Sequence, residues 1–473
     1  MRVAVVGASG FVGKSLINYL LDHTRHEVVA LSRTPLAVNH PEAPSRYRAI
    51  SCDLHNLLQL EQALEGIDTA FYLVHSMLPG ARLNQGNFSD FDLSLADNFA
   101  RTARLRGVKH VIYLSGLVPA GNTISQHLQS RLEVETTLRS YLPNVTCLRT
   151  GMIIGPKGSS FTILIRLAQR LPLMVCPGWT TNRCQIIVLA DVVRCLSACL
   201  DRPDLQGKTF DLGANPPVSY RGMIADTAQL LGKKPIMLNF PYFTIGLSKL
   251  WVRLVTGAPK DLVYPLINSL SESMLVRPDH QWPDRDPPFK DFLTAARETL
   301  PDVLSSGEKP HAFRGFKPGK DGTVRSIQRL PLPQGRRAAW VAQQYLARLP
   351  KVFPLLVKVR NQDDRVLLQL TFLPITLLVL KYSPERSAPD RQLFYVQGGL
   401  LCSRKNRRGR LELRETLGGT ACLAAVHDFR PALPWVIYRW TQAEVHRWFM
   451  YRLARAIQKD ANKKALAEPA SAT

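Results

Sequence analysis

Three glycines near the start of the chain are the first residues whose spacing indicates chemistry, in the stretch Gly7-Ala-Ser-Gly-Phe-Val-Gly13. The first glycine permits a tight turn, the second leaves no Cβ where a diphosphate approaches, and the third lets a helix close onto a strand. The amide groups at the start of that helix then face the phosphates. An ordinary glycine-rich turn would not need all three. The spacing therefore predicts a dinucleotide site, with contacts from Gly7, Ser9, Gly10, Phe11, Val12 and Gly13.

A cation stands where the second predicted strand ends. NAD-binding proteins of this type carry an acidic residue about 20 residues beyond the glycines, where it holds the ribose 2′-hydroxyl. Here 33 − 13 = 20 leads to Ser32-Arg33 instead. Because a guanidinium suits a 2′-phosphate, the sequence favours NADP(H), with NAD(H) as the alternative cofactor. A solvated surface arginine is the other interpretation of Arg33.

The glycines and Arg33 require a βα framework, and the hydrophobic pattern supplies one. Val3–Val6 is a β-branched apolar run typical of a buried parallel strand, and Lys14–Asp22 carries leucines at helical spacing. Further strands are expected at Glu27–Leu31, Tyr47–Cys52, Thr69–Val74 and Val108–Leu114, with helices at Leu57–Leu64 and Leu93–Arg106. This alternation predicts an α/β fold with a doubly wound, Rossmann-like parallel sheet.

Ligands bind such sheets at the carboxyl ends of the strands. The residues at those ends therefore extend the predicted cofactor site. They are Ser32, Arg33, Asp53, Leu54, Val74 and His75. Ser115 follows the next strand and is expected at the same edge of the sheet.

Several different motifs follow one another in order along the chain. They are Gly7–Gly13, Asp53-Leu54, Tyr72-Leu-Val-His-Ser76, Tyr113-Leu-Ser-Gly-Leu117, Leu148-Arg-Thr-Gly-Met-Ile-Ile-Gly-Pro156, Gln185-Ile-Ile-Val-Leu-Ala-Asp191 and Phe210-Asp-Leu-Gly213. Together they resemble the atypical, extended-type short-chain dehydrogenase/reductase superfamily in its NmrA-like branch, over about the first 300 residues. The resemblance implies the fold and an NAD(P) cofactor, and is less specific for the reaction.

In that superfamily a serine, a tyrosine and a lysine perform hydride chemistry. Ser115 fits the serine, but 12 residues on, at the usual tyrosine, the chain reads His127-Leu-Gln-Ser-Arg131, so tyrosine and lysine are both replaced. Arg131 can bind the ribose but cannot shuttle a proton near neutral pH. His127 is either a proton donor or a polar residue in a pocket that no longer catalyses. The candidate catalytic residues are Ser115, His127 and Arg131.

A smaller lobe is expected after Pro156. Its segments Leu171–Trp179 and Pro241–Val255 are apolar enough to wall a hydrophobic pocket for a bulky, weakly polar substrate. Pro301–Thr323 is rich in Pro, Gly, Ser and Lys and marks a domain boundary. The predicted organisation is an NAD(P)-binding domain with its lobe at 1–300, a linker at 301–323, a second domain at 324–460 and a flexible tail at 461–473.

The second domain has the pattern of an α+β fold. Helices are expected at Arg336–Leu349 and Gln442–Lys459, and strands at Leu355–Arg360, Val366–Phe372, Ile375–Tyr382, Leu393–Leu401, Arg410–Glu415 and Cys422–Asp428. An antiparallel meander between two helices predicts a helix-grip-like domain, which commonly holds an apolar ligand. Strings such as Ser383-Pro-Glu-Arg-Ser387 and His427–Trp435 resemble an uncharacterised domain fused behind nucleotide-binding domains of this kind. That resemblance names no activity.

The chain of 473 residues carries a formal net charge of +24, which favours anionic partners. Basic residues dominate Arg404–Arg410, an expected hairpin loop. This loop is either a solvated turn or a contact with anionic lipid headgroups, worth about 1 kcal/mol per charge. It carries no aromatic residue for base stacking, which argues against nucleic acid as a partner.

Nothing in the sequence indicates a signal peptide or a spanning helix, so we expect a cytoplasmic protein that can associate peripherally with membranes. Eight cysteines without a C-x-x-C pair are expected to be reduced thiols, and no metal site is predicted. The oligomeric state is not indicated.

Two functions fit these residues. The first is an NADP(H)-dependent oxidoreductase or epimerase-like enzyme acting on a hydrophobic carbonyl or quinone-like substrate. The second is a non-catalytic NADP-binding protein that serves as a redox sensor, an assembly factor or a lipid-binding adaptor. The replaced tyrosine and lysine motivate the second.

Overall fold

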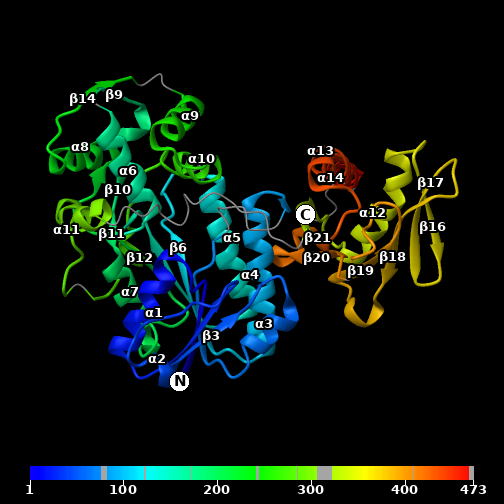
Figure 1. Cartoon of the computed structure of the whole chain (residues 1–473), viewed down its shortest axis with the longest axis horizontal. Helices are drawn as coiled ribbons and strands as arrows, with labels where there is room; N and C mark the ends of the chain where they lie inside the picture. The colour runs from blue at the N-terminus through cyan, green and yellow to red at the C-terminus, as the bar shows by residue number, and fades with distance from the viewer. Residues whose placement is uncertain are drawn as a thin grey trace. The chain divides into compact units, whose positions relative to one another are not determined.

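The computed structural model describes residues 1–75, 83–121, 124–171, 173–240, 244–284, 286–305, 322–406 and 408–467. The chain divides into two compact units, one formed by residues 1–78 and 95–315 and the other by residues 79–94 and 316–473 (Figure 1). The sequence pattern places residues 79–94 within the N-terminal domain, whereas the structure groups them with the second unit. Most of the predicted 301–323 linker and the end of the tail lie outside the described residues.

The first unit is built on a seven-stranded parallel sheet in the order β12-β7-β6-β4-β1-β2-β3. Its strands are β1 (Arg2–Val6), β2 (Glu27–Ser32), β3 (Tyr47–Ser51), β4 (Thr69–Tyr72), β6 (His110–Gly116), β7 (Val145–Thr150) and β12 (Thr209–Leu212). The helices around it are α1 (Phe11–His23), α2 (Ala43–Arg46), α3 (Leu57–Ala63), the part of α4 (Phe88–Leu105) from Leu95 onward, α5 (Gln126–Tyr141) and α7 (Leu189–Ala198).

Both faces of this sheet are covered by hydrophobic layers. Ala4 and Val6 of β1 belong to the same buried cluster as Phe99 of α4. Val3 and Val5, which point the other way, belong to a second cluster with α1 and α7. Alternate residues of a strand face opposite sides of a sheet, so β1 is buried on both sides. The predicted doubly wound, Rossmann-like sheet is confirmed.

A smaller lobe, drawn largely in green in Figure 1, completes the first unit. Its helices are α6 (Ser159–Arg170), α8 (Tyr220–Leu230), α9 (Ile245–Thr256), α10 (Lys260–Ser269) and α11 (Phe292–Ser305). Its strand pairs are β8 (Ile153–Ile154) with β11 (Ile187–Val188), β9 (Leu173–Cys176) with β14 (Ile236–Asn239), and β10 (Arg183–Cys184) with β13 (Val218–Ser219). Phe161, Trp179 and Met223 lie in the hydrophobic cluster that these elements share.

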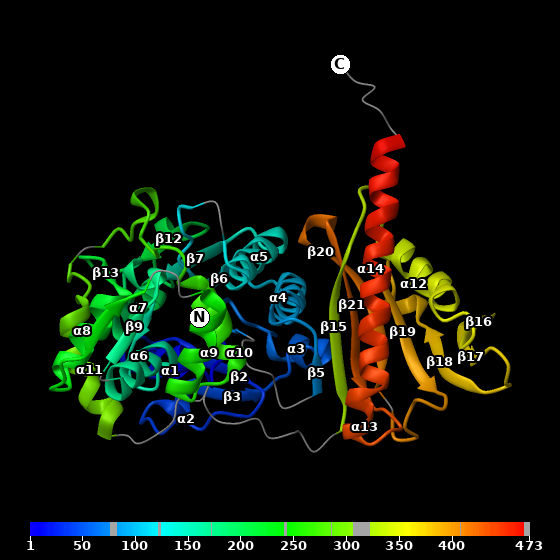
Figure 2. The same cartoon turned by 90° about the horizontal axis from the view of Figure 1, so that it is seen from above.

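The second unit is built on an eight-stranded sheet in the order β16-β17-β18-β19-β20-β21-β15-β5 (Figure 2). Its strands are β5 (Leu83–Gln85), β15 (Val324–Pro331), β16 (Val357–Gln362), β17 (Arg365–Leu370), β18 (Thr376–Tyr382), β19 (Arg391–Gly398), β20 (Arg410–Thr416) and β21 (Ala421–Phe429). Its helices are α12 (Ala338–Val352), α13 (Trp435–Trp440) and α14 (Gln442–Ala467). Neighbouring strands are antiparallel except β5 and β15. The predicted antiparallel-sheet domain is confirmed.

A buried acid lies in the second sheet. Glu412 of β20 is 2% exposed; its Oε1 accepts a hydrogen bond of 2.7 Å from Arg391 Nε and forms an ion pair of 2.8 Å with Arg414 Nη2. The Nε2 atom of His427 is 3.7 Å from the other carboxylate oxygen. Burial by itself raises the pKa of Glu412, but Arg414, Arg391 and Arg410 outweigh it and lower the pKa from 4.5 to about 2. The carboxylate is therefore held in its charged form.

Replacing Glu412 by glutamine should destabilise the protein by about 3 kcal/mol at pH 7, because buried arginines lose their counter-charge. The pKa is lower in the folded state, so the stability from Glu412 is fully present above pH 4.5 and is lost as the pH falls toward 2. Urea unfolding of the full chain measures both effects. Glu444→Gln, which breaks the exposed ion pair with Arg447, is the control and should cost less than about 1 kcal/mol. Equal unfolding curves for the two variants would contradict the expectation.

Candidate functional site

The turn after β1 requires glycine at two positions. Gly7 has a φ of +95°, and a Cβ there would lie 3.0 Å from the carbonyl oxygen of Leu73. A Cβ on the buried Gly13 would lie 2.5 Å from the carbonyl oxygen of Gly7. Gly10 is different, because it is exposed and its Cβ would meet only the Gly7 oxygen, at 3.1 Å. Gly7 and Gly13 therefore shape the turn, whereas the bare backbone at Gly10 faces outward.

The start of α1 offers backbone amides to an anion. Gly10 is the N-cap residue, and no side chain of the described residues caps this helix end. The first turn carries no acidic residue, and Ser9 beside it is exposed. The first amides of a helix have no partner within the helix, and its positive dipole end attracts negative charge. This geometry fits a dinucleotide diphosphate.

Ser32 and Arg33 follow at the carboxyl end of β2. The Ser32 hydroxyl is buried and donates a hydrogen bond of 2.5 Å to the carbonyl of Thr34. The Arg33 side chain is exposed, while its carbonyl accepts a hydrogen bond of 3.0 Å from the Ser51 hydroxyl. No described residue forms an ion pair with Arg33, so its guanidinium is available to an anion. Ser32 supports the loop rather than presenting its hydroxyl to a ligand.

Asp53 and Leu54 stabilise the loop after β3. An Asp53 carboxylate oxygen accepts a hydrogen bond of 3.1 Å from the amide of His55. Leu54 is buried, and its carbonyl accepts a hydrogen bond of 2.9 Å from the Asn98 side chain. The sequence predicted both as cofactor contacts, and the structure places them at the carboxyl end of β3. A contact with the cofactor remains a prediction for each.

His127 lies in the first turn of α5, where it meets His75. The Ser125 hydroxyl caps the helix by accepting a hydrogen bond of 3.3 Å from the amide of Leu128. The rings of His75 and His127 are in edge-to-face contact with their centroids 5.0 Å apart. Two predicted site residues, 52 positions apart in the sequence, are thus brought together.

Arg131, one helical turn later, connects two strand ends. Its side chain is 7% exposed; Nη2 donates a hydrogen bond of 2.5 Å to the carbonyl of Leu114 and Nη1 one of 3.4 Å to that of Val74. The guanidinium also lies over the ring of Tyr113, 5.0 Å from its centroid. Its side chain therefore holds the carboxyl ends of β4 and β6 together, which makes it a positioning residue in this geometry.

Ser115 of β6 is 4% exposed, and its hydroxyl has no hydrogen-bond partner among the described residues. The next residue, Gly116, lines a large cavity, whereas Ser115 is not part of that lining. The predicted serine therefore lies beside the cavity wall.

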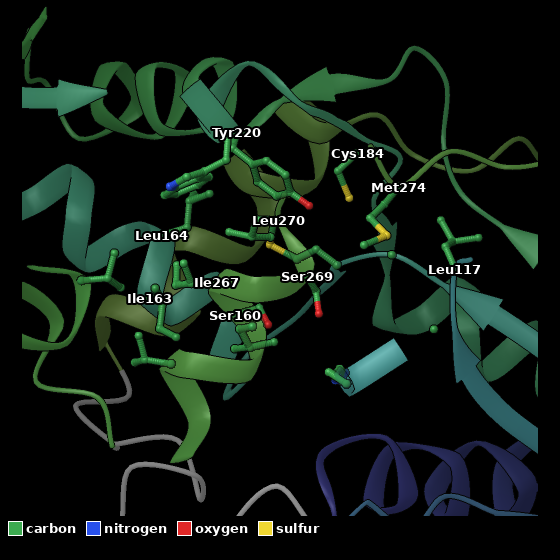
Figure 3. A pocket seen from close by; sticks show the side chains of 18 of the residues that line it. Leu117, Ser160, Ile163, Leu164, Cys184, Tyr220, Ile267, Ser269, Leu270 and Met274 are labelled. Carbon is green, nitrogen blue, oxygen red and sulfur yellow. The ribbon is translucent and has the colours of Figure 1, made fainter. Parts of the chain in front are cut away.

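The cavity lies within the small lobe and at the ends of β6 and β7 (Figure 3). Its outline, including the part that is open to solvent, spans about 950 Å³. Gly116, His127 and Thr150 line it where the sheet ends. Most of the remaining lining is apolar, from Leu117, Ile163, Leu164, Leu167, Trp179, Ile224, Val252, Val263, Leu266, Ile267, Leu270 and Met274. Such an apolar lining suits a weakly polar molecule.

The polar groups of the cavity are few and mostly neutral. Figure 3 shows the Tyr220 hydroxyl directed toward the sulfur of Cys184. Burial, together with the nearby thiol, raises the pKa of Tyr220 well above its ordinary value, and burial also raises the pKa of Cys184. The Ser269 hydroxyl lies 2.9 Å from that of Ser125. At neutral pH the tyrosine and the thiol are therefore uncharged.

The sequence missed these cavity residues as a group. It indicated an apolar lobe, but Tyr220, Cys184 and Ser269 come from three separate segments that no motif joins. The apolar composition of 241–255 was the available signal, and Val252 from that segment does line the cavity.

Other groups singled out in the sequence lie elsewhere. Arg404, Lys405 and Arg408 are exposed in the loop before β20, whereas Arg407 lies outside the described residues. Arg410 belongs to β20 and forms a 2.9 Å ion pair with Asp428, so it is not part of the exposed run. Lipid contact by this loop stays a prediction.

The eight cysteines are all free thiols and all buried. In the part of the chain that the structure describes, no group of three or more His, Cys, Asp or Glu side chains is arranged to hold a metal ion. Among the same residues, none of the helices is both long and apolar enough to cross a bilayer.

A family model described as NAD(P)H-binding matches residues 7–159, which include the glycine turn, both histidines and Arg131. The first unit therefore contains an NAD(P)-binding domain. The match agrees with the cradle around Gly7 and Gly13 and with the uncapped start of α1.

Three curated proteins show how far this similarity extends. The auxiliary protein GraX of Staphylococcus aureus is 29% identical over 136 residues, which cover 29% of this chain and 43% of GraX, less than half its length. An uncharacterized UDP-glucose epimerase, YtcB of Bacillus subtilis, is 23% identical over 269 residues, covering 50% and 83% of the two chains. The ceramide reductase of Caulobacter vibrioides is 24% identical over 240 residues, covering 50% and 73%.

A solved structure supports the fold of the NAD(P)-binding domain. The NADPH-dependent quinone oxidoreductase QOR2 of Escherichia coli, complexed with NADPH, superimposes with a TM-score of 0.50 at 16% identity. The alignment covers 63% of this chain and 99% of that one. These comparisons agree with the NAD(P)H-binding model over residues 7–159 and with the Rossmann-like fold of the first unit.

Proposed function

We propose that this protein is an NADP(H)-dependent oxidoreductase that reduces a bulky, weakly polar carbonyl or quinone-like substrate bound in the cavity. The observation that carries the proposal is the position of His127. This side chain lines an apolar cavity at the strand ends, the edge of the sheet that also carries the glycine turn. An ionisable group on the wall of a largely apolar cavity is a candidate proton donor.

The reaction divides between the cofactor and this chain. Bound NADPH would supply a hydride to the substrate carbonyl carbon. His127 would give a proton to the substrate oxygen as that oxygen becomes negatively charged, so the product is an alcohol. Arg131 keeps the ends of β4 and β6 in place, and the apolar walls exclude water from the reacting groups.

The names of the similar proteins point to two substrate classes, and the cavity lining favours one of them. A ceramide reductase and a quinone oxidoreductase are named for a lipid and for quinones. The UDP-glucose epimerase is named for a nucleotide sugar, whose hydroxyl groups need many hydrogen-bonding partners. A cavity with mostly leucine and isoleucine walls favours the first class.

The preference for NADP(H) is tested at Arg33. Replacing Arg33 by serine should weaken NADPH binding by about 2 kcal/mol, or about 30-fold, because a charge-assisted contact with the 2′-phosphate is lost. NADH, which lacks that phosphate, should bind almost as before. Isothermal calorimetry with both cofactors measures this difference. Arg48→Ser is the control, since Arg48 is exposed near the opposite end of β3. An equal loss for NADPH and NADH would count against the preference.

A second candidate function is NADP-dependent binding without catalysis. The contacts of Arg131 favour it, because its guanidinium already engages two backbone carbonyls in the region where the superfamily lysine would bind the ribose. The cofactor would then act as a signal that stabilises one form of the protein. The His127 variant described in the Discussion separates the two functions.

A further inference from the structure

The outward side of the small lobe carries large apolar side chains in contact with solvent. In the β9–β14 pair, Ile236 lies opposite Leu173 and Leu238 lies two residues further along the same face. These three side chains are 51% (Leu173), 63% (Ile236) and 50% (Leu238) exposed, whereas Met174, on the other face, is buried. The two strands therefore present a hydrophobic face outward.

Helix α9 continues this pattern. Leu247, Leu250 and Leu254 are 49%, 44% and 72% exposed. Val252 points the other way, is fully buried and lines the cavity. A surface helix normally turns polar residues to solvent, so a helix that is apolar on both sides indicates an apolar partner outside. Helix α9 thus separates the cavity from an exposed hydrophobic surface.

The two parts of this surface meet near the end of α6. Arg170 Nη1 donates a hydrogen bond of 2.6 Å to the carbonyl of Val255 in α9, and Lys233, just before β14, donates one to the carbonyl of Gln169. In Figure 1 β9, β14 and α9 lie at the same end of the lobe. We call this surface the outer face. Its members are Leu173, Ile236, Leu238, Leu247, Leu250 and Leu254.

Basic residues predominate in the segment that forms most of the outer face. Residues 227–260 contain five basic residues and no acidic one, between Asp226 and Asp261. Lys233, Lys234, Arg253 and Lys260 are exposed, and Lys249 is half-buried. An apolar surface bordered by cations has the chemistry of a surface that lies in the interface of an anionic bilayer. Soluble monomers rarely expose apolar patches of this kind.

We propose that the outer face binds to anionic lipid bilayers. Its apolar side chains then lie at the boundary between headgroups and acyl chains, and its cations contact the lipid phosphates. The consequence for the substrate rests on the proposed function. Because α9 lies between the bilayer and the cavity, the substrate is a lipid-like molecule that is drawn from the membrane, not from the aqueous phase.

The test is co-sedimentation of the full chain with phosphatidylcholine vesicles, with and without phosphatidylglycerol. Wild-type protein should bind the anionic vesicles, and added salt should weaken that binding. The double variant Leu250→Glu with Leu254→Glu should bind at least about tenfold more weakly, because charge is moved into an apolar layer. The matched control is Leu293→Glu with Leu304→Glu, two α11 leucines that are 41% and 48% exposed outside the outer face. This control should bind like the wild type.

Cofactor calorimetry without vesicles keeps this proposal separate from the proposed function. A Leu250/Leu254 variant that binds NADPH normally but no longer binds vesicles supports the bilayer proposal, whatever substrate is reduced. Absence of vesicle binding by the wild type, or equal binding by both double variants, would overturn it. So would light scattering that shows the outer face joining two copies of the chain, with the variant monomeric and vesicle binding unchanged.

Discussion

Changing Gly10 to aspartate is expected to weaken NADPH binding several hundredfold while the protein stays folded. The added carboxylate would lie at the start of α1, where the diphosphate is expected. Two negative charges about 4 Å apart repel by about 4 kcal/mol at an effective dielectric constant of 20, close to a thousandfold in Kd. The fold should tolerate the change, since Gly10 is exposed and aspartate is a favourable N-cap residue. Calorimetry and thermal unfolding of the same sample measure both parts.

Gly13→Ala is the matched comparison because it changes packing without adding charge. Its Cβ would lie 2.5 Å from the Gly7 carbonyl oxygen, so the turn itself must shift. This variant should lose stability and cofactor binding together, whereas Gly10→Asp should lose binding alone. If Gly10→Asp bound NADPH as tightly as the wild type, the diphosphate would not rest on this turn, and the assignment of the cofactor site would fail.

The parallel sheet could be predicted from the sequence because its strands are local signals. β1 was expected at Val3–Val6 and is observed at Arg2–Val6, and β2 was expected at Glu27–Leu31 and is observed at Glu27–Ser32. Strands buried on both faces are nearly continuous apolar runs, and the helices between them show helical spacing. The glycine turn added the position of the cofactor edge.

Two strands of the second sheet were not predicted, since their pairing is non-local. β5 has the sequence Leu-Asn-Gln, with no apolar pattern, and it becomes a strand by pairing with β15, where Val324 lies opposite Leu83. β15 mixes arginines with apolar residues. Its two sides have different neighbours, because Val324 and Leu330 belong to one hydrophobic cluster and Ile327 to another. Contacts between residues so far apart in sequence leave no local periodicity to read.

The residues of the candidate site could be predicted from the sequence, but their burial and the cavity beside them could not. Motif counting reached His127 and Arg131, and the structure shows the first on the cavity wall and the second buried against two carbonyls. Ser115 was expected at the reaction centre because of its place in the sequence, yet it lies beside the wall. The cavity itself depends on how α6, α8, α9 and α10 pack, which single-sequence patterns do not encode.

Replacing His127 by alanine is expected to lower kcat on a hydrophobic carbonyl or quinone substrate by on the order of 1,000-fold, within the range for a positioned general acid. NADPH affinity should change little, because the diphosphate site is made by a different turn. Steady-state NADPH oxidation over a panel of hydrophobic carbonyls and quinones gives kcat and KM, and calorimetry gives the cofactor Kd. The pH dependence of kcat should flatten in the variant, which loss of packing alone would not produce.

Ser269→Ala provides the matched control, since Ser269 lines the same cavity and carries no group that could protonate a substrate near neutral pH. It should change KM more than kcat. If His127→Ala and Ser269→Ala had the same small effect on kcat, His127 would only shape the cavity. The reduction would then need another donor. A third outcome is that no substrate is turned over although NADPH binds normally, and that Gly10→Asp alone abolishes the cellular function. Binding without catalysis would then explain why tyrosine and lysine have been replaced by His127 and Arg131.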